Sequence, residues 1–245
     1  MRNKICYLLL SLLVFTAESF SAVNINIGQL NDTLESNKNT LQKKIYNAGD
    51  STAFVQIEVV EVNINYKGEE SELKPDRDKK NISFMASPSR LIIPGDSFQV
   101  SRIVFTGTRE YERYFRVRYM PVQPNENNNF GLSPDQIKDN DTNTLKAGMG
   151  LSIGYGTLVV VRPNTSIYST RINDGANEFK VVNSGNTVAI LRYTNTCSNV
   201  TKKCHGFGED LNVYPGQSRV FLKEKDSTHS FTLVEGGNSR KIKLP

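Results

Sequence analysis

After residue 22 the chain consists of short apolar runs separated by turn-forming residues. Valine, isoleucine and aromatic residues fill the runs, and Asn, Gly, Pro and Asp lie between them. The runs are KIYNAG, AFVQIEVVEVNINY, RLIIPG, FQVSRIVF, YFRVRYMPV, TLVVVRP, EFKVVNSG, VAILRYT, LNVYPG, SRVFL, SFTLVEG and RKIKLP. Helical periodicity is nearly absent after the N-terminal segment, so the pattern predicts an all-β fold built from β-sandwiches.

One stretch, LKAGMGLSIGYGTLVVVRP at 145–163, has an unusual pattern. Its apolar odd positions are Leu145, Ala147, Met149, Leu151 and Ile153. Four of the six even positions from 146 to 156 are glycine, which weakens a strand, whereas the TLVVV run is apolar on both faces. We expect Thr157–Val161 to be buried on both sides and 145–153 to extend as an edge strand. The alternative is a strand that packs its odd face on its own core, with glycines at a crowded crossing.

Turn chemistry repeats along the chain. NAGDST (47–52) is followed by IPGDS (93–97), and NSGNT (183–187) is followed by YPGQS (214–218). Pro-Gly pairs preset the dihedrals of a type II turn. The repeat predicts two related sandwiches in tandem, at 23–162 and 163–245, although such turns also recur by chance.

A polar, Asn-rich stretch, PVQPNENNNFGLSPDQIKDNDTNT, occupies 121–144. Long loops inside compact domains are usually functional or disordered. We expect a loop here that helps to keep the following edge strand in solution.

The first 22 residues, MRNKICYLLLSLLVFTAESFSA, contain two cations, an apolar run and a small-residue end. This pattern predicts a cleaved secretory signal peptide, with the cleavage site after Ser21 or Ala22. We therefore expect an exported protein that is not membrane-embedded, since no later apolar run could span a membrane. The net charge of +5 is mild and the basic residues are scattered, which argues against nucleic-acid binding.

Outside the signal segment the chain has one pair of cysteines, Cys197 and Cys204. In an exported chain such a pair predicts a disulfide that closes a short loop. The alternative, a zinc site, lacks ligands, because His205 and His229 are the only histidines. We expect no metal site.

The motifs ASPSRLIIPGDSFQVSRIVFTG, ERYFRVRYMPV, GTLVVVRP, VVNSGNT and VYPGQSRVF occur in the order found in periplasmic fimbrial chaperones of the chaperone–usher pathway. The chain resembles this family, and most of all its alternate, alpha-type branch, which serves common-pilus-like fimbriae. The resemblance implies two immunoglobulin-like domains set at an angle, with a pilus subunit bound in the cleft. It also implies that the chaperone lends a strand to the subunit, here Leu145, Ala147, Met149, Leu151 and Ile153.

The family also holds the subunit's C-terminal carboxylate with a pair of cations, and here the chain departs from its better-known members. The stretch VNINIGQLNDTL has neither Arg nor Lys, and Leu158 stands where those members have a lysine. The resemblance to the alpha-type motif suggests Arg116 as the anchor, and Lys43, Lys44 and Arg118 are further candidates. The alternative for the two arginines is a solvated face.

The resemblance implies a non-enzymatic function: binding, folding and delivery of fimbrial subunits to an outer-membrane usher, without cofactor, nucleic acid or small-molecule substrate. The rival hypothesis is a structural pilus subunit or surface adhesin. A subunit usually carries its donor segment near the N-terminus, whereas here the donor-like strand is internal and precedes a second domain. That order favours the chaperone.

Overall fold

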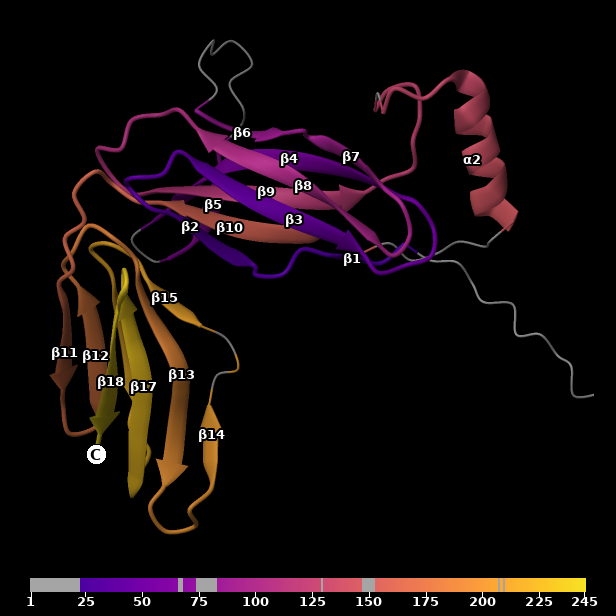
Figure 1. The fold of residues 1–245 in the computed structure, drawn as a ribbon. Helices are drawn as coiled ribbons and strands as arrows, with labels where there is room; N and C mark the ends of the chain where they lie inside the picture. The colour runs from indigo at the N-terminus through magenta and orange to yellow at the C-terminus, as the bar shows by residue number, and fades with distance from the viewer. Residues whose placement is uncertain are drawn as a thin grey trace, which may run out of the picture.

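The computed structural model describes residues 23–65, 68–73, 83–128, 130–146, 153–206, 208 and 210–245. Within these ranges the chain forms four β-sheets, which pair into two sandwiches. Figure 1 shows the two sandwiches as lobes set at an angle to each other. The predicted all-β fold of two sandwiches is therefore confirmed.

The first sandwich packs sheet A on sheet B. Sheet A has the order β1 (Ile25–Asn26), β3 (Thr40–Asn47), β8 (Ser97–Phe105) and β6 (Phe84–Ser87). Sheet B has the order β2 (Asn31–Leu34), β10 (Tyr155–Val161), β9 (Arg113–Pro121), β4 (Ala53–Ile64) and β5 (Glu70–Glu72), and β7 (Arg90–Ile93) pairs with β4. Ile45 and Ile103 of sheet A meet Val55, Val117 and Val159 of sheet B in the core.

The second sandwich packs sheet C on sheet D. Sheet C has the order β11 (Thr170–Asp174), β12 (Glu178–Asn183) and β16 (Ser218–Leu222). Sheet D has the order β14 (Cys204–Gly206), β13 (Ala189–Ser198), β17 (Ser227–Glu235) and β18 (Asn238–Leu244), and β15 (Leu211–Val213) pairs with β13. Its core contains Phe179, Val181, Leu191, Phe231 and Leu233.

Strand β10 is buried on both faces from Thr157 to Val161, as its sequence predicts. Val159 and Val161 enter the core of the first sandwich. Leu158 and Val160 point the other way and pack against Val188 of the second sandwich. The second apolar face of this strand is therefore explained by the contact between the two sandwiches.

The disulfide predicted between Cys197 and Cys204 is confirmed. The two residues are opposite each other on β13 and β14, with sulfur atoms 2.10 Å apart. The bond closes the hairpin at the far end of the second sandwich.

The repeated turn chemistry corresponds to one repeated structural device. Asn47 and Asn183 are each 1% exposed at the end of a strand. The Asn47 amide donates to the Ile93 carbonyl (3.1 Å), and the Asn183 amide donates to the Val213 carbonyl (2.8 Å). Each side-chain oxygen also accepts the N–H two residues ahead, at 3.1 and 2.9 Å. In both sandwiches a buried asparagine thus ties its own turn to the strand that enters the Pro-Gly turn.

The expectation of a loop throughout 121–144 is wrong. Helix α2 (Pro134–Lys146) lies there, and Figure 1 shows it at the end of the first lobe remote from the second. Ser133 and Gln136 form a capping box: the Gln136 N–H donates to the Ser133 hydroxyl (3.3 Å), and the Ser133 N–H donates to the Gln136 side chain (2.8 Å). No helix in the described residues is long and apolar enough to cross a membrane.

The predicted domain boundary lies in the connection between β10, which ends at Val161, and β11, which begins at Thr170. The division at Arg162 and Pro163 stays a prediction. The expected signal peptide, 1–22, lies outside the described residues.

Candidate functional site

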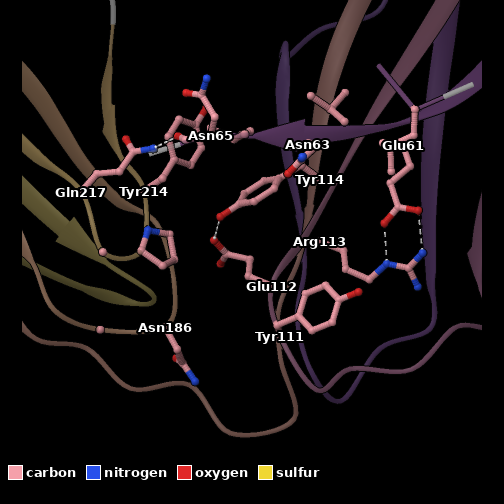
Figure 2. A pocket seen from close by; sticks show the side chains of 16 residues that line it. Glu61, Asn63, Asn65, Tyr111, Glu112, Arg113, Tyr114, Asn186, Tyr214 and Gln217 are labelled. Carbon is pink, nitrogen blue, oxygen red and sulfur yellow. Dashed lines mark hydrogen bonds and ion pairs between the residues drawn. The ribbon is translucent and has the colours of Figure 1, made fainter. Parts of the chain in front are cut away.

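A cleft of about 610 Å³ lies where the two sandwiches meet. One wall is formed by the end of β4 and the start of β9, and the other by the Pro-Gly turn of the second sandwich. Figure 2 shows Tyr114 from the first wall facing Tyr214 from the second, and their rings meet edge to face with centroids 5.3 Å apart. The cleft therefore has an aromatic floor contributed by both sandwiches.

A buried carboxylate fixes this junction. Glu112 accepts hydrogen bonds from the Tyr114 hydroxyl (2.5 Å) and from the Val188 backbone N–H of the second sandwich (2.8 Å). Its second oxygen pairs with Arg162 at 2.7 Å, and the two side chains are 1% and 4% exposed. We call these four residues the junction cluster. Because one carboxylate binds groups from both sandwiches, it sets their relative placement.

Burial shifts the titration of the junction cluster. It raises the pKa of Glu112 above its ordinary value, and the charge of Arg162 acts in the opposite direction without cancelling the effect. Burial likewise raises the pKa of Tyr114, and the neighbouring Glu112 charge adds to that rise. The Tyr114 hydroxyl is therefore a stable hydrogen-bond donor at any physiological pH.

Two further contacts border the cleft. Arg113 makes a bidentate pair with Glu61, with both N–O distances 2.7 Å (Figure 2). Gln217 of the second sandwich donates to the Asn65 carbonyl at the end of β4. The β4–β5 hairpin is thereby attached to the second sandwich.

The arginines that the sequence predicted on one face are indeed neighbours there. Arg116 lies between Val60 of β4 and Leu158 of β10, and Arg118 is two residues further along β9. We call Arg116 and Arg118 with their outward-facing surroundings on sheet B the arginine face. Arg116 is two residues from the cleft residue Tyr114 and lies opposite Leu158, which clusters with Tyr114 and Tyr214. The arginine face therefore adjoins the cleft.

Each of these arginines has a carboxylate partner. Arg116 pairs with Glu70 of β5, and Arg118 pairs with Glu72 of the same strand. Arg118 also lies 3.9 Å from Glu58. Nothing in the spacing of the sequence pointed to these carboxylates, although the Gly68 turn after the long β4 run is a hairpin signal that would have placed them beside β4.

The structure does not bring the two candidate lysines to the arginine face. Lys43 points from β3 into the first sandwich, is 5% exposed, and pairs with Asp32 at 2.7 Å. Lys44 points to the opposite face of sheet A, where its ammonium lies 3.6 Å from the centre of the Phe98 ring. Of the four candidate anchors, Arg116 and Arg118 are thus the ones that share a surface next to the cleft.

The predicted donor strand is only partly described. Ala147, Met149 and Leu151 lie outside the described residues. Leu145 belongs to the last turn of α2, so the expectation of extended backbone there is wrong. It failed because Leu145 and Lys146 continue the helix that the capping box at Ser133 starts. Ile153 is described, precedes β10, and is 60% exposed.

The first part of β10 has an open edge. On one side β10 pairs with β9 over its whole length. On the other side β2 pairs only with Leu158–Val161, so Tyr155–Thr157 have no partner strand there within the described residues. Unpaired edges of this kind accept another strand.

One glycine is explained by its own sandwich rather than by another chain. A Cβ at Gly154 would lie 3.2 Å from the Tyr119 carbonyl oxygen of β9. A larger residue would crowd the backbone there. The alternative interpretation, glycine at a crowded crossing, therefore holds at this position.

Comparison with known proteins shows which proteins the chain is similar to. No family model matches it. A probable fimbrial chaperone, EcpB of Escherichia coli O139:H28, is 27% identical over 205 residues, which cover 81% of both chains. The solved structure of the class 5 fimbriae chaperone CfaA has a TM-score of 0.56 at 19% identity and covers 91% of this chain and 100% of its own. The chain is therefore similar to fimbrial chaperones over most of its length. The resemblance expected from the sequence motifs is confirmed.

A further solved structure contains a fimbrial chaperone with its partner. In the complex of the Salmonella enterica SafA pilin with the SafB chaperone, the match has a TM-score of 0.54 at 16% identity and covers 90% of this chain and 95% of the other. The fold of the chain is thus one that solved structures contain both alone and beside a pilin.

Proposed function

We propose that the chain is a fimbrial chaperone that acts in the periplasm, where it binds fimbrial subunits, assists their folding and delivers them to an outer-membrane usher. The subunit would bind in the cleft and along the strand that leads into β10. No enzymatic step, metal or cofactor is part of this proposal.

The open edge of β10 carries the proposal. Tyr155 and Gly156 have no partner strand on this side within the described residues, and the exposed Ile153 precedes them. A subunit that lacks a strand could pair with this edge and receive the side chains of Leu145, Ala147, Met149, Leu151 and Ile153 in its open groove. Each large apolar side chain would contribute about 1.5–3 kcal/mol on full burial, before ordering costs.

Strand lending would require α2 to end earlier. Leu145 lies in the helix, so it could join an extended strand only if the last helical turn unwinds when a subunit binds. Helix ends fray easily, because their last carbonyl groups have no partner within the helix. The proposal therefore includes a helix-to-strand change at 145–146.

The arginine face would hold the subunit's C-terminal carboxylate. Arg116 is our first candidate because it lies next to Leu158, the position where better-known members of the resembled family carry a lysine. A guanidinium suits this role because it can bind a carboxylate through two parallel hydrogen bonds. Arg118 is second, and the partners of Lys43 and Lys44 make these residues poorer candidates.

Export through a cleaved signal peptide at 1–22 is the remaining part of the proposal. The apolar run and small-residue end of this segment support it. Mass spectrometry of protein from the periplasmic fraction would give the mature N-terminus.

The decisive experiment is co-expression of the tagged chaperone with each subunit encoded beside it, followed by affinity purification. We expect at least one subunit to co-purify in equimolar amount and to be degraded or aggregated without the chaperone. If none co-purifies and the chain instead assembles into fibres on its own, the rival function of a pilus subunit or adhesin is favoured.

A further inference from the structure

The two guanidinium groups of the arginine face are already neutralised by the chain itself. Arg116 pairs with Glu70, with side chains 28% and 37% exposed. Arg118 pairs with Glu72 and also approaches Glu58. In the described part of this face, three carboxylates thus surround two cations. A carboxylate that arrives from outside must therefore compete for these cations with the carboxylates already present.

The pair of Arg116 is the one suited to exchange. Among the described residues, Arg116 has one carboxylate partner, whereas Arg118 lies between two. Arg116 is also closer along β9 to the cleft residue Tyr114. Because the Arg116–Glu70 pair is partly exposed, its net strength is small, and replacing one carboxylate by another changes the free energy little.

Strand β5 can release its side chain without disturbing the core. It has three residues, all exposed, at the edge of sheet B. Its backbone stays paired with β4 through Ile64–Glu70, Asn63–Ser71 and Val62–Glu72. The Glu70 side chain can therefore rotate into solvent while the hairpin remains in place.

We propose that Glu70 is an internal stand-in for the client's carboxylate. It holds the Arg116 guanidinium in position until the C-terminal carboxylate of a subunit takes its place. This inference rests on the proposed function, in which Arg116 anchors that carboxylate. It adds a selection step: a free carboxylate in the periplasm must compete with Glu70, whereas a subunit gains the strand contacts as well.

The test is the exchange rate of a purified complex. The probe is the fimbrial subunit that co-purifies with the wild-type chaperone, and an excess of differently tagged wild-type chaperone captures released subunit. We expect Glu70→Gln to slow release about three- to tenfold, because Arg116 no longer has a competing charge. We expect Arg116→Ala to speed release about tenfold or more, and the double variant to behave as Arg116→Ala.

Glu69→Gln is the matched control. It removes the same charge from the same hairpin, but Glu69 accepts its hydrogen bond from Asn65 at 2.8 Å and not from an arginine. We expect its complex to exchange at the wild-type rate. Equal slowing by both variants would mean that general charge is responsible and would overturn the proposal.

The outcomes distinguish the anchor role of Arg116 from the role of Glu70 as its internal partner. If Arg116→Ala speeds release but Glu70→Gln leaves it unchanged, Arg116 is the anchor and the stand-in role is wrong. If Arg116→Ala changes nothing in a folded protein, the anchor fails and the inference fails with it. If no subunit co-purifies, the proposed function itself is overturned.

Discussion

The paired strands β9 and β10 have two ends with opposite environments. The inner end meets the second sandwich, where Val160 is buried and Glu112 and Arg162 form a buried ion pair. The outer end contains the exposed Ile153 and the open edge at Tyr155 and Gly156, and the partly exposed Arg116 lies between the two ends. One pair of strands thus uses its inner end for the fold and keeps its outer end accessible. The Glu112–Arg162 ion pair at the inner end is buried, whereas the Arg116–Glu70 ion pair is partly exposed.

The largest effect on stability is expected at the core of the inner end. Val159→Asp places a charge at a position that is 1% exposed and is surrounded by apolar side chains. The cost of burying it exceeds about 4 kcal/mol, enough to unfold the first sandwich. Denaturant unfolding followed by circular dichroism measures this. A variant that melts like the wild type would mean that β10 is not part of the core.

Arg162→Met comes next, because it leaves the Glu112 carboxylate buried without its cation. Breaking a buried pair costs about 3–5 kcal/mol. The cost should depend on pH. Burial already raises the pKa of Glu112 above its ordinary value of 4.5, and a raised folded pKa means that stability is lost as the pH rises through it. Removing Arg162 raises this pKa further.

Unfolding curves at acidic and neutral pH test whether the stability of the variant falls as the pH rises. The penalty of Arg162→Met should be small below the ordinary pKa of Glu112, where the carboxyl is protonated in both states, and should grow toward neutral pH. A double variant that also carries Glu112→Gln should lose the dependence. A penalty that shrinks as the pH rises would contradict the assignment.

Arg116→Ala should have a small effect on the free protein and a larger effect on the complex. The Arg116–Glu70 pair is partly exposed, so its loss costs at most about 1 kcal/mol. Losing a charge-assisted hydrogen bond to a client carboxylate would weaken binding by about tenfold. Melting curves beside subunit pull-downs separate the two. If the variant is stable and still recovers normal amounts of subunit, Arg116 is not the anchor and Arg118 becomes the first candidate.

The smallest effect on stability is expected at the outer end. Ile153→Asp changes a side chain that is 60% exposed, so the melting temperature should stay within about 2 °C of the wild type. Leu151→Asp, at a position outside the described residues, is predicted to behave alike. Both should abolish recovery of the subunit. Variants that melt as early as Val159→Asp would show that these residues belong to the chaperone's own core, and strand lending would be wrong.

The sequence predicted the parts of the fold that depend on local rules. All twelve apolar runs are strands, and the disulfide and the repeated turns are where the spacing placed them. Helix α2 was missed because its polar composition hides the apolar period, although Ser133, Pro134 and Gln136 are a capping signal. The helix continues to Lys146, so it includes the first two residues of the alternating pattern that predicted a strand.

The candidate site was harder to predict. Alternation along β9 placed Arg116 and Arg118 on one face, but the carboxylates that neutralise them come from a strand some 46 residues away. Glu112 gave no signal either, because its role depends on Val188 and Arg162, which are distant in sequence. Spacing within a strand predicts which side chains share a face. It does not predict which partner a different strand brings to them.

The junction cluster has a consequence for the entropy of binding. Because Glu112 ties the two sandwiches together through buried bonds, the walls of the cleft lose their relative freedom when the chaperone folds. A client that enters the cleft then orders only itself and the strand it receives. The cleft is in this sense preorganised, because the folding free energy of the chaperone already sets its shape. The binding free energy of the client therefore remains available for the exchange of strands.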